Sequence, residues 1–116
     1  MRFRLLAGCL AILIGGCAST SSSKDASTAA ALDRILAGDH RSQANRARDA
    51  YRHPKDTLLF FGITPDMTVV EVWPGGGWYT EILAPLLREH GKLYAAQLDA
   101  SGSDYVRSTV ETYRTK

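Results

Sequence analysis

The chain is poor in the residues that carry covalent or metal chemistry. Two cysteines and three histidines occur among 116 residues, and no second cluster of Cys, His, Asp or Glu at metal-ligand spacing accompanies His40 or His53. No Ser/His/Asp or Cys/His arrangement is recognisable. No Lys-Ser or Lys-Thr pair follows the glycine cluster, as a phosphate-binding loop requires. The sequence therefore argues against a metal centre, a nucleophilic hydrolase and a P-loop NTPase.

Net charge is also nearly absent. The formal charge of +2 comes from 14 basic and 12 acidic residues. Two of the 14 basic residues, Arg2 and Arg4, lie in an N-terminal segment that we expect to be removed, which leaves 12 of each sign. A general nucleic-acid binder needs a broad basic surface that displaces counterions. We therefore expect no nucleic-acid partner.

Residues 1–16 have the three regions of a secretory signal. Arg2 and Arg4 precede an apolar run over residues 5–14, and two glycines follow before Cys17. The run is too short for a membrane-spanning helix, which takes about 20 residues. We therefore expect residues 1–16 to be a cleaved signal peptide and the protein to be exported to the periplasm.

The sequence Ile14-Gly15-Gly16-Cys17 resembles the lipobox of bacterial lipoproteins. That resemblance implies cleavage before Cys17 and lipidation of its sulfur and nitrogen, with acyl chains that hold the protein on a membrane. Ala18, in place of aspartate, favours the outer membrane in enteric-type sorting. The alternative is that Cys17 is only a small residue near a conventional cleavage site. Cys9 is removed in either case, so the mature chain has no internal disulfide.

The remaining sequence predicts a flexible Ser/Thr-rich linker over residues 17–27 and an α/β domain over residues 28–116. Near-continuous apolar character predicts a central first strand covered on both faces. Pro85 is expected to kink or break its helix. The predicted helices are 28–37, 42–51, 54–61, 78–89 and 104–114, and the predicted strands are 68–72 and 92–98. Ser103 or Asp104 can cap the last helix.

This order of elements is typical of the N-terminal part of a doubly wound, Rossmann-like sheet, with two βα units preceded by helices. The last helix has no terminating glycine or proline, and a complete doubly wound sheet needs more βα units. We therefore expect the chain to be a fragment of a larger domain.

The segment Val69-Val70-Glu71-Val72-Trp73-Pro74-Gly75-Gly76-Gly77-Trp78-Tyr79-Thr80 is the most informative part of the chain. A β-branched run stops at three glycines and then continues as helix-like sequence. Glycines allow positive φ and let a ligand approach main-chain N–H groups. In open α/β sheets, ligands bind beyond the carboxyl ends of the strands. We therefore expect a ligand at this corner, with residues 97–101 on the same edge.

This segment resembles the first motif of the class I S-adenosylmethionine-dependent methyltransferases. Glu71 matches the motif's acidic residue, Gly75 and Gly77 match its second and third glycines, and Trp73 stands where the first glycine belongs. The flanking words Tyr51-Arg52-His53-Pro54 and Phe60-Phe61-Gly62-Ile63 are similar to a bacterial group of predicted, often exported, methyltransferases. The likeness covers about residues 39–100. It implies S-adenosylmethionine as cofactor and methyl transfer as the reaction.

In that family an acid at the end of the second strand binds the ribose. Gln97 occupies the position here, and Asp99 is the alternative. Trp73 is either a stacking wall for the cationic sulfonium or an apolar plug. Both tryptophans, alternatively, only pack, and Glu71 either binds the cofactor or accepts N–H bonds from the turn. The predicted cofactor residues are Glu71, Trp73, Gly75, Gly76, Gly77, Trp78, Gln97 and Asp99.

A small cationic patch precedes this motif. It is either a solvated helix face or a contact for an anionic substrate or lipid head groups, and it consists of Arg41, Arg46, Arg48, Arg52 and Lys55. Methyl transfer needs an acceptor held in line with the methyl group and requires no protein nucleophile, and the sequence does not identify the catalytic residues or the acceptor. The alternative function is a non-catalytic lipoprotein that uses the fold as a binding or interaction module.

Overall fold

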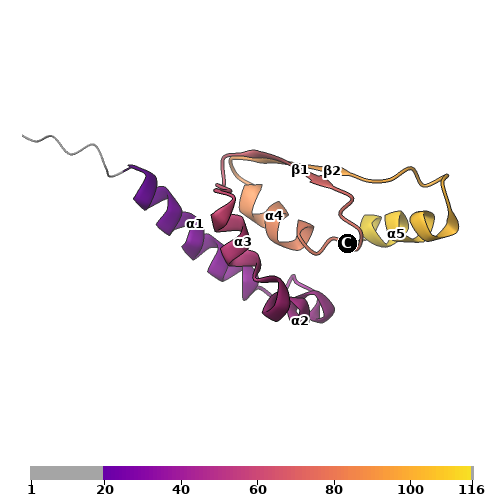
Figure 1. The fold of residues 1–116 in the computed structure, drawn as a ribbon, viewed down its shortest axis with the longest axis horizontal. Coiled ribbons are helices and arrows are strands. Elements are labelled where there is room, and N and C mark those ends of the chain that lie inside the picture. The colour runs from indigo at the N-terminus through magenta and orange to yellow at the C-terminus, as the bar shows by residue number, and fades with distance from the viewer. Residues whose placement is uncertain (1–19, 116) are drawn as a thin grey trace, which may run out of the picture.

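The computed structural model describes residues 20–115, which form five helices and a two-stranded parallel sheet (Figure 1). This is the α/β class that the sequence predicts. The predicted signal peptide and Cys17 lie outside the described residues. No described helix is both long and apolar enough to cross a membrane. The elements are α1 (Thr20–Leu36), α2 (Gln43–Arg52), α3 (Pro54–Phe60), β1 (Thr68–Val72), α4 (Thr80–Leu87), β2 (Lys92–Ala96) and α5 (Asp104–Arg114).

Helix α4 is the centre of the described core. It connects the two strands, lies beneath the sheet in Figure 1, and packs on its other side against α1. Apolar side chains of α4 recur at helical spacing, so one stripe faces the sheet and the neighbouring stripe faces the N-terminal helices. The buried core consists of Leu32, Leu58, Ile82, Leu83, Leu86 and Leu87.

The sheet is covered on one face only within the described chain. Strands β1 and β2 are parallel and in register, with Val70 opposite Tyr94. Val69 and Leu93 pack against the core, whereas Val70, Val72 and Tyr94 on the opposite face are 57%, 78% and 55% exposed. The expectation that β1 is covered on both faces is therefore wrong for residues 20–115, because the described helices supply one layer.

Pro85 does not interrupt α4, although the helix ends at Leu87 rather than at residue 89. A proline at this position cannot donate a hydrogen bond to the carbonyl of Glu81. His40 Nε2 lies 3.0 Å from that carbonyl oxygen, and since a carbonyl only accepts, the ring nitrogen donates. The partner that the proline removes is thus replaced from the α1–α2 connection.

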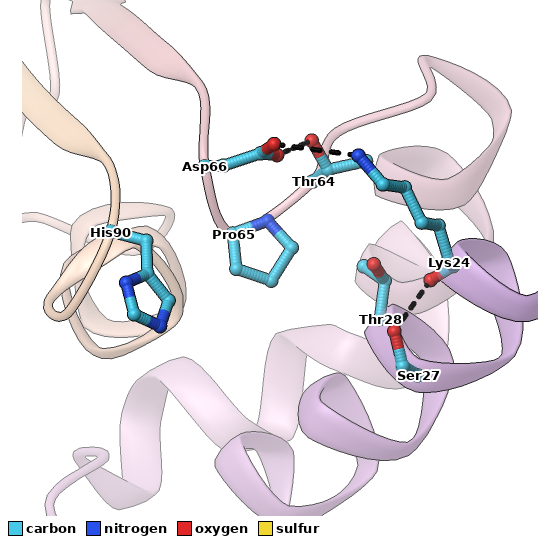
Figure 2. Close-up of a pocket in the computed structure, with 7 residues that line it drawn as sticks. All are labelled: Lys24, Ser27, Thr28, Thr64, Pro65, Asp66 and His90. Carbon is cyan, nitrogen blue, oxygen red and sulfur yellow. Dashed lines mark hydrogen bonds and ion pairs between the residues drawn. The ribbon is translucent and has the colours of Figure 1, made fainter.

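Helix α1 begins at Thr20, eight residues before the predicted start, so the prediction of a flexible linker over 17–27 is wrong for residues 20–27. Lys24 reaches across to the turn before β1, where its Nζ lies 3.6 Å from Asp66 Oδ2 (Figure 2). Ser27 Oγ donates a 2.9 Å hydrogen bond to the carbonyl of Lys24. The ion pair joins residues 42 positions apart, so the composition of the segment gives no sign of it.

The other element boundaries agree closely with the sequence. The chain breaks between α2 and α3 at His53, which adopts φ +43° before Pro54, as a residue that precedes proline avoids the helical region. Ser103 caps α5 by accepting the N–H of Val106 at 3.2 Å. Strand β2 ends at Ala96, two residues earlier than predicted.

Gly91, at the corner between α4 and β2, has no room for a side chain. An added Cβ would lie 2.6 Å from the carbonyl oxygen of Met67 and 2.7 Å from that of Pro65. We expect Gly91→Ala to lower the free energy of unfolding by about 1–3 kcal/mol, because backbone must move. Gly76→Ala is the matched control, since a Cβ there meets nothing within 4 Å. Chemical denaturation of both variants checks this; equal stabilities would contradict the packing described.

Candidate functional site

A cavity of about 500 Å³ lies at the carboxyl end of β1, beside the glycine loop. It brings together five of the eight predicted cofactor residues, and these are Glu71, Trp73, Gly75, Gly76 and Trp78. Six other residues line it that were not predicted as cofactor residues, and these are Arg48, Arg52, Val72, Pro74, Tyr79 and Tyr105. Helix α2, the β1–α4 loop and the first turn of α5 therefore meet at one site.

The loop turns through three residues with positive φ. These are Trp73 at +50°, Gly75 at +56° and Gly77 at +78°. The strained tryptophan is held by its N–H, which donates to the carbonyl of Ala96 at 2.8 Å and so extends the pairing of β1 and β2 by one residue. Gly77 N–H donates to the carbonyl of Pro74 at 2.9 Å and closes the turn.

The loop backbone is open at Gly75 and Gly76. A Cβ built at either position meets nothing within 4 Å, so a ligand can approach the main chain there. No described residue accepts a hydrogen bond from the N–H group of Gly75 or Gly76. Unpaired N–H groups in a glycine loop before a helix are suited to carboxylate, phosphate or carbonyl oxygens.

Glu71 is half-buried and is engaged by the start of α4. Thr80 Oγ1 donates to Glu71 Oε2 at 2.6 Å, and the backbone N–H of Thr80 also bonds the carboxylate. Burial raises the pKa of Glu71 above its ordinary value of 4.5, and the Thr80 hydrogen bonds offset part of that rise. The carboxylate thus accepts from the turn, as one of the two sequence interpretations expected, while it still lines the cavity.

The two tryptophans have different environments. Trp78 is 4% exposed, and its indole Nε1 donates to the carbonyl of Asn45 at 2.9 Å. Its ring also contacts Tyr79 edge to face, with centroids 4.5 Å apart. Trp73 is 53% exposed and lines the cavity without filling it. Packing therefore describes Trp78, whereas the indole of Trp73 is accessible to a ligand.

Three predicted residues do not line this cavity. Gly77 is buried within the turn. Asp99 accepts from Ser101 N–H at 3.0 Å and Ser101 Oγ at 2.8 Å, and these bonds lower its pKa. Gln97 follows β2, and both its side-chain amide atoms are buried without a partner in the described chain. The carboxyl end of β2 is therefore separate from the cavity, with one amide that lacks hydrogen bonds.

The predicted cationic patch is not one surface. Arg41 is fully buried and forms a bidentate pair with Asp49. Lys55 Nζ lies 2.6 Å from an oxygen of Asp33, and the pairing of Arg46 with Asp39 is looser, at 3.9 Å. The guanidinium carbons of the remaining two arginines, Arg48 and Arg52, lie 5.9 Å and 4.8 Å from the centroid of the Trp78 ring.

The sequence contains a signal for these two arginines in their i, i+4 spacing, which places both on one helix face. It contains none for Tyr79 or Tyr105, because nothing local indicates that α5 approaches the glycine loop.

A smaller cavity of about 230 Å³ lies at the opposite, amino end of the strands (Figure 2). Lys24, Thr28, Asp66 and His90 are among its lining residues, and Thr28 Oγ1 is buried there without a partner in the described chain. In open α/β sheets ligands bind beyond the carboxyl ends of strands, so the glycine-loop cavity is the better candidate. Residues 20–115 contain no group of three or more potential metal ligands.

Comparison of the chain with protein-family models, with curated proteins and with solved structures finds no match. The resemblance to methyltransferases therefore stays a prediction that depends on the motif and its setting.

The raised pKa of Glu71 predicts the pH dependence of stability. The folded state holds the proton of Glu71 more tightly than the unfolded state does. The contribution of Glu71 to the free energy of unfolding is therefore largest at acid pH and is lost as pH rises through the folded pKa. Relative to the wild type, Glu71→Gln should become more stable as pH rises above the ordinary value of 4.5. Denaturant unfolding at several pH values measures this.

Asp99→Asn is the control of opposite sign. The pKa of Asp99 is lowered, so its contribution is present above the ordinary value of 3.8 and is lost in acid. The asparagine variant should lose stability relative to the wild type as pH rises toward the ordinary value of 3.8. If both variants respond to pH in the same direction, the environment described for Glu71 is wrong.

Proposed function

We propose that the cavity beside the glycine loop binds S-adenosylmethionine and that the described residues are the N-terminal part of a doubly wound, class I methyltransferase-like sheet. One observation carries the proposal. A glycine loop with positive φ at Gly75 follows the carboxyl end of β1 and leads into α4, and its backbone is open where a ligand would lie.

The residues present fit that cofactor. The cavity volume of about 500 Å³ lies within the range of small-molecule sites, roughly 300–1,000 Å³. The exposed indole of Trp73 suits a sulfonium cation, and the N–H groups of Gly75 and Gly76 suit polar cofactor atoms. Gln97, the predicted ribose partner, does not line the cavity in the described chain, although its buried amide has no hydrogen-bond partner there.

S-adenosylmethionine, when bound, would supply an activated methyl group. The domain then has to hold an acceptor in line with the methyl carbon, which requires no protein nucleophile. In the described chain the cavity provides positioning groups, namely two arginines, two tyrosines and the loop backbone, and these are compatible with that task.

The alternative function is a non-catalytic interaction module, and the exposed sheet face favours it. Val70, Val72 and Tyr94 form an apolar surface of the kind that marks a protein contact. Val72 also lines the glycine-loop cavity, but Val70 and Tyr94 do not, so most of this surface lies outside the proposed cofactor site.

We further propose that the protein is exported and lipid-anchored at Cys17, on the face of a membrane that borders the periplasm. The support is the sequence pattern of residues 1–17. Cysteine lipidation would place the domain within a short distance of the membrane.

Isothermal titration calorimetry with S-adenosylmethionine tests the cofactor site. We expect micromolar affinity that falls at least about tenfold in Gly75→Val, because valine is strained at positive φ and its side chain occupies the ligand's approach. Glu71→Ala should weaken binding as well, since it removes a carboxylate that lines the cavity and accepts a hydrogen bond from Thr80.

Gly62→Val is the matched control for Gly75→Val. Gly62 has φ +65° and nothing within 4 Å of an added Cβ, so the strain is similar, but the residue is remote from the cavity. Affinity should survive this change. Absent binding by the wild type, or equal affinity in the Gly62 and Gly75 variants, would contradict the proposed site.

Substitution of the predicted lipidated residue tests the anchor. Cys17→Ser removes the sulfur that would carry lipid, so we expect an uncleaved precursor or a protein released from membranes. Membrane fractionation and intact mass of the native protein measure this. Normal processing and continued membrane attachment of the serine variant would show that Cys17 is not the anchor.

A further inference from the structure

Two arginines of α2 project over the ligand cavity from successive turns of one helix. Arg48 and Arg52 are four residues apart, and both line the same cavity as the glycine loop. Their guanidinium carbons lie 5.9 Å and 4.8 Å from the centroid of the Trp78 ring. Stacking on an aromatic ring orients a guanidinium but leaves its N–H groups available.

Neither arginine is neutralised by a carboxylate of the described chain. Other basic residues of the predicted cationic patch do have acidic partners: Arg41 pairs with Asp49, and Lys55 pairs with Asp33. The one carboxylate that lines the cavity belongs to Glu71, which accepts hydrogen bonds from Thr80.

Two like charges one helical turn apart repel each other. A cavity that holds two unpaired guanidinium groups is therefore more stable with an anion in it. An anion would reduce the repulsion between the two arginines and would accept charged hydrogen bonds from them, so both effects favour its binding.

The glycine loop adds neutral donors to the same cavity. The N–H groups of Gly75 and Gly76 have no acceptor among the described residues. Guanidinium groups and unpaired backbone N–H groups together are the donors that recognise carboxylate and phosphate oxygens. The charged and the neutral donors of this cavity therefore both favour a ligand with a carboxylate or phosphate group.

We propose that Arg48 and Arg52, supported by Trp78, bind the carboxylate or phosphate group of a ligand that lies along the glycine loop. The proposal rests on the function proposed above in that it uses the same cavity. Two sources can supply the anion. One is the amino-acid carboxylate of S-adenosylmethionine, and the other is an anionic methyl acceptor.

The experiment uses three probes and the full chain. Pyrophosphate reports the anion site alone, S-adenosylmethionine reports a cofactor with its carboxylate, and methylthioadenosine reports the nucleoside part without the amino acid. Binding is followed by calorimetry and by tryptophan fluorescence, since Trp78 contacts both arginines. The variant is the double change Arg48→Gln and Arg52→Gln, and the control is Arg46→Gln, an arginine of α2 that does not line the cavity.

We expect pyrophosphate to bind the wild type and the Arg46 control, to change their fluorescence, and to bind the double variant at least about tenfold more weakly. The lysine pair, Arg48→Lys with Arg52→Lys, should be intermediate, because it keeps the charge and loses the planar fork. Equal pyrophosphate affinity in the wild type and the double variant would overturn the proposal, provided circular dichroism shows both to be folded.

The nucleoside probes then assign the source. Loss of S-adenosylmethionine affinity in the double variant, with unchanged methylthioadenosine affinity, would identify the cofactor's own carboxylate. Unchanged affinity for both, with weakened pyrophosphate binding, would identify an anionic acceptor. Pyrophosphate binding by a wild type that binds neither nucleoside would disprove the cofactor proposal and leave the anion site standing.

Discussion

The buried hydrogen bond from Trp78 Nε1 to the carbonyl of Asn45 joins helix α2 to the glycine loop. An indole N–H in a 4% exposed side chain needs an acceptor, and here the acceptor is a backbone atom at the start of α2. Asn45 is the buried residue of that helix, whose other side chains are mostly solvated. This contact therefore decides where α2 lies, and with it where Arg48 and Arg52 lie.

A second group of polar contacts holds the connection between α1 and α2 against α4. His40 supplies the hydrogen bond that Pro85 takes from the carbonyl of Glu81, and the side chain of Glu81 accepts the N–H of Ser42 at 3.2 Å. Proline inside a helix ordinarily costs about 3 kcal/mol through the lost bond and steric crowding. Replacement of the lost bond by a residue 41 positions distant links the N-terminal helices to the crossover helix. The N-terminal helices are thus part of the site's framework.

The described sheet is a two-stranded platform with helices on one face. At the carboxyl end of β1 the loop is closed by main-chain hydrogen bonds and by the bond from Thr80, at the start of α4, to Glu71. The opposite face of the sheet is apolar and open, with Val72 78% exposed. Parallel sheets are usually covered on both faces, whereas the described residues cover only one face of this sheet. The ligand cavity supports the cofactor proposal, and the open sheet face supports the alternative of an interaction module.

The features that local chemistry controls were predictable from sequence. Proline after His53 sets the break between α2 and α3, the β-branched run sets β1, and the three glycines set the loop, since each depends on neighbouring backbone conformations. Because the loop leads from β1 into α4, five predicted cofactor residues share one cavity.

Side-chain contacts decided the rest. The early start of α1 accompanies an ion pair from Lys24 to Asp66, the burial of Arg41 depends on Asp49, and the separation of Asp99 from the cavity follows from its bonds to Ser101. The sequence alone determined an α/β chain with a glycine corner at the end of its first strand. Only the tertiary structure decided that α2 lies against this corner, because the buried Trp78 N–H finds its acceptor 33 residues away.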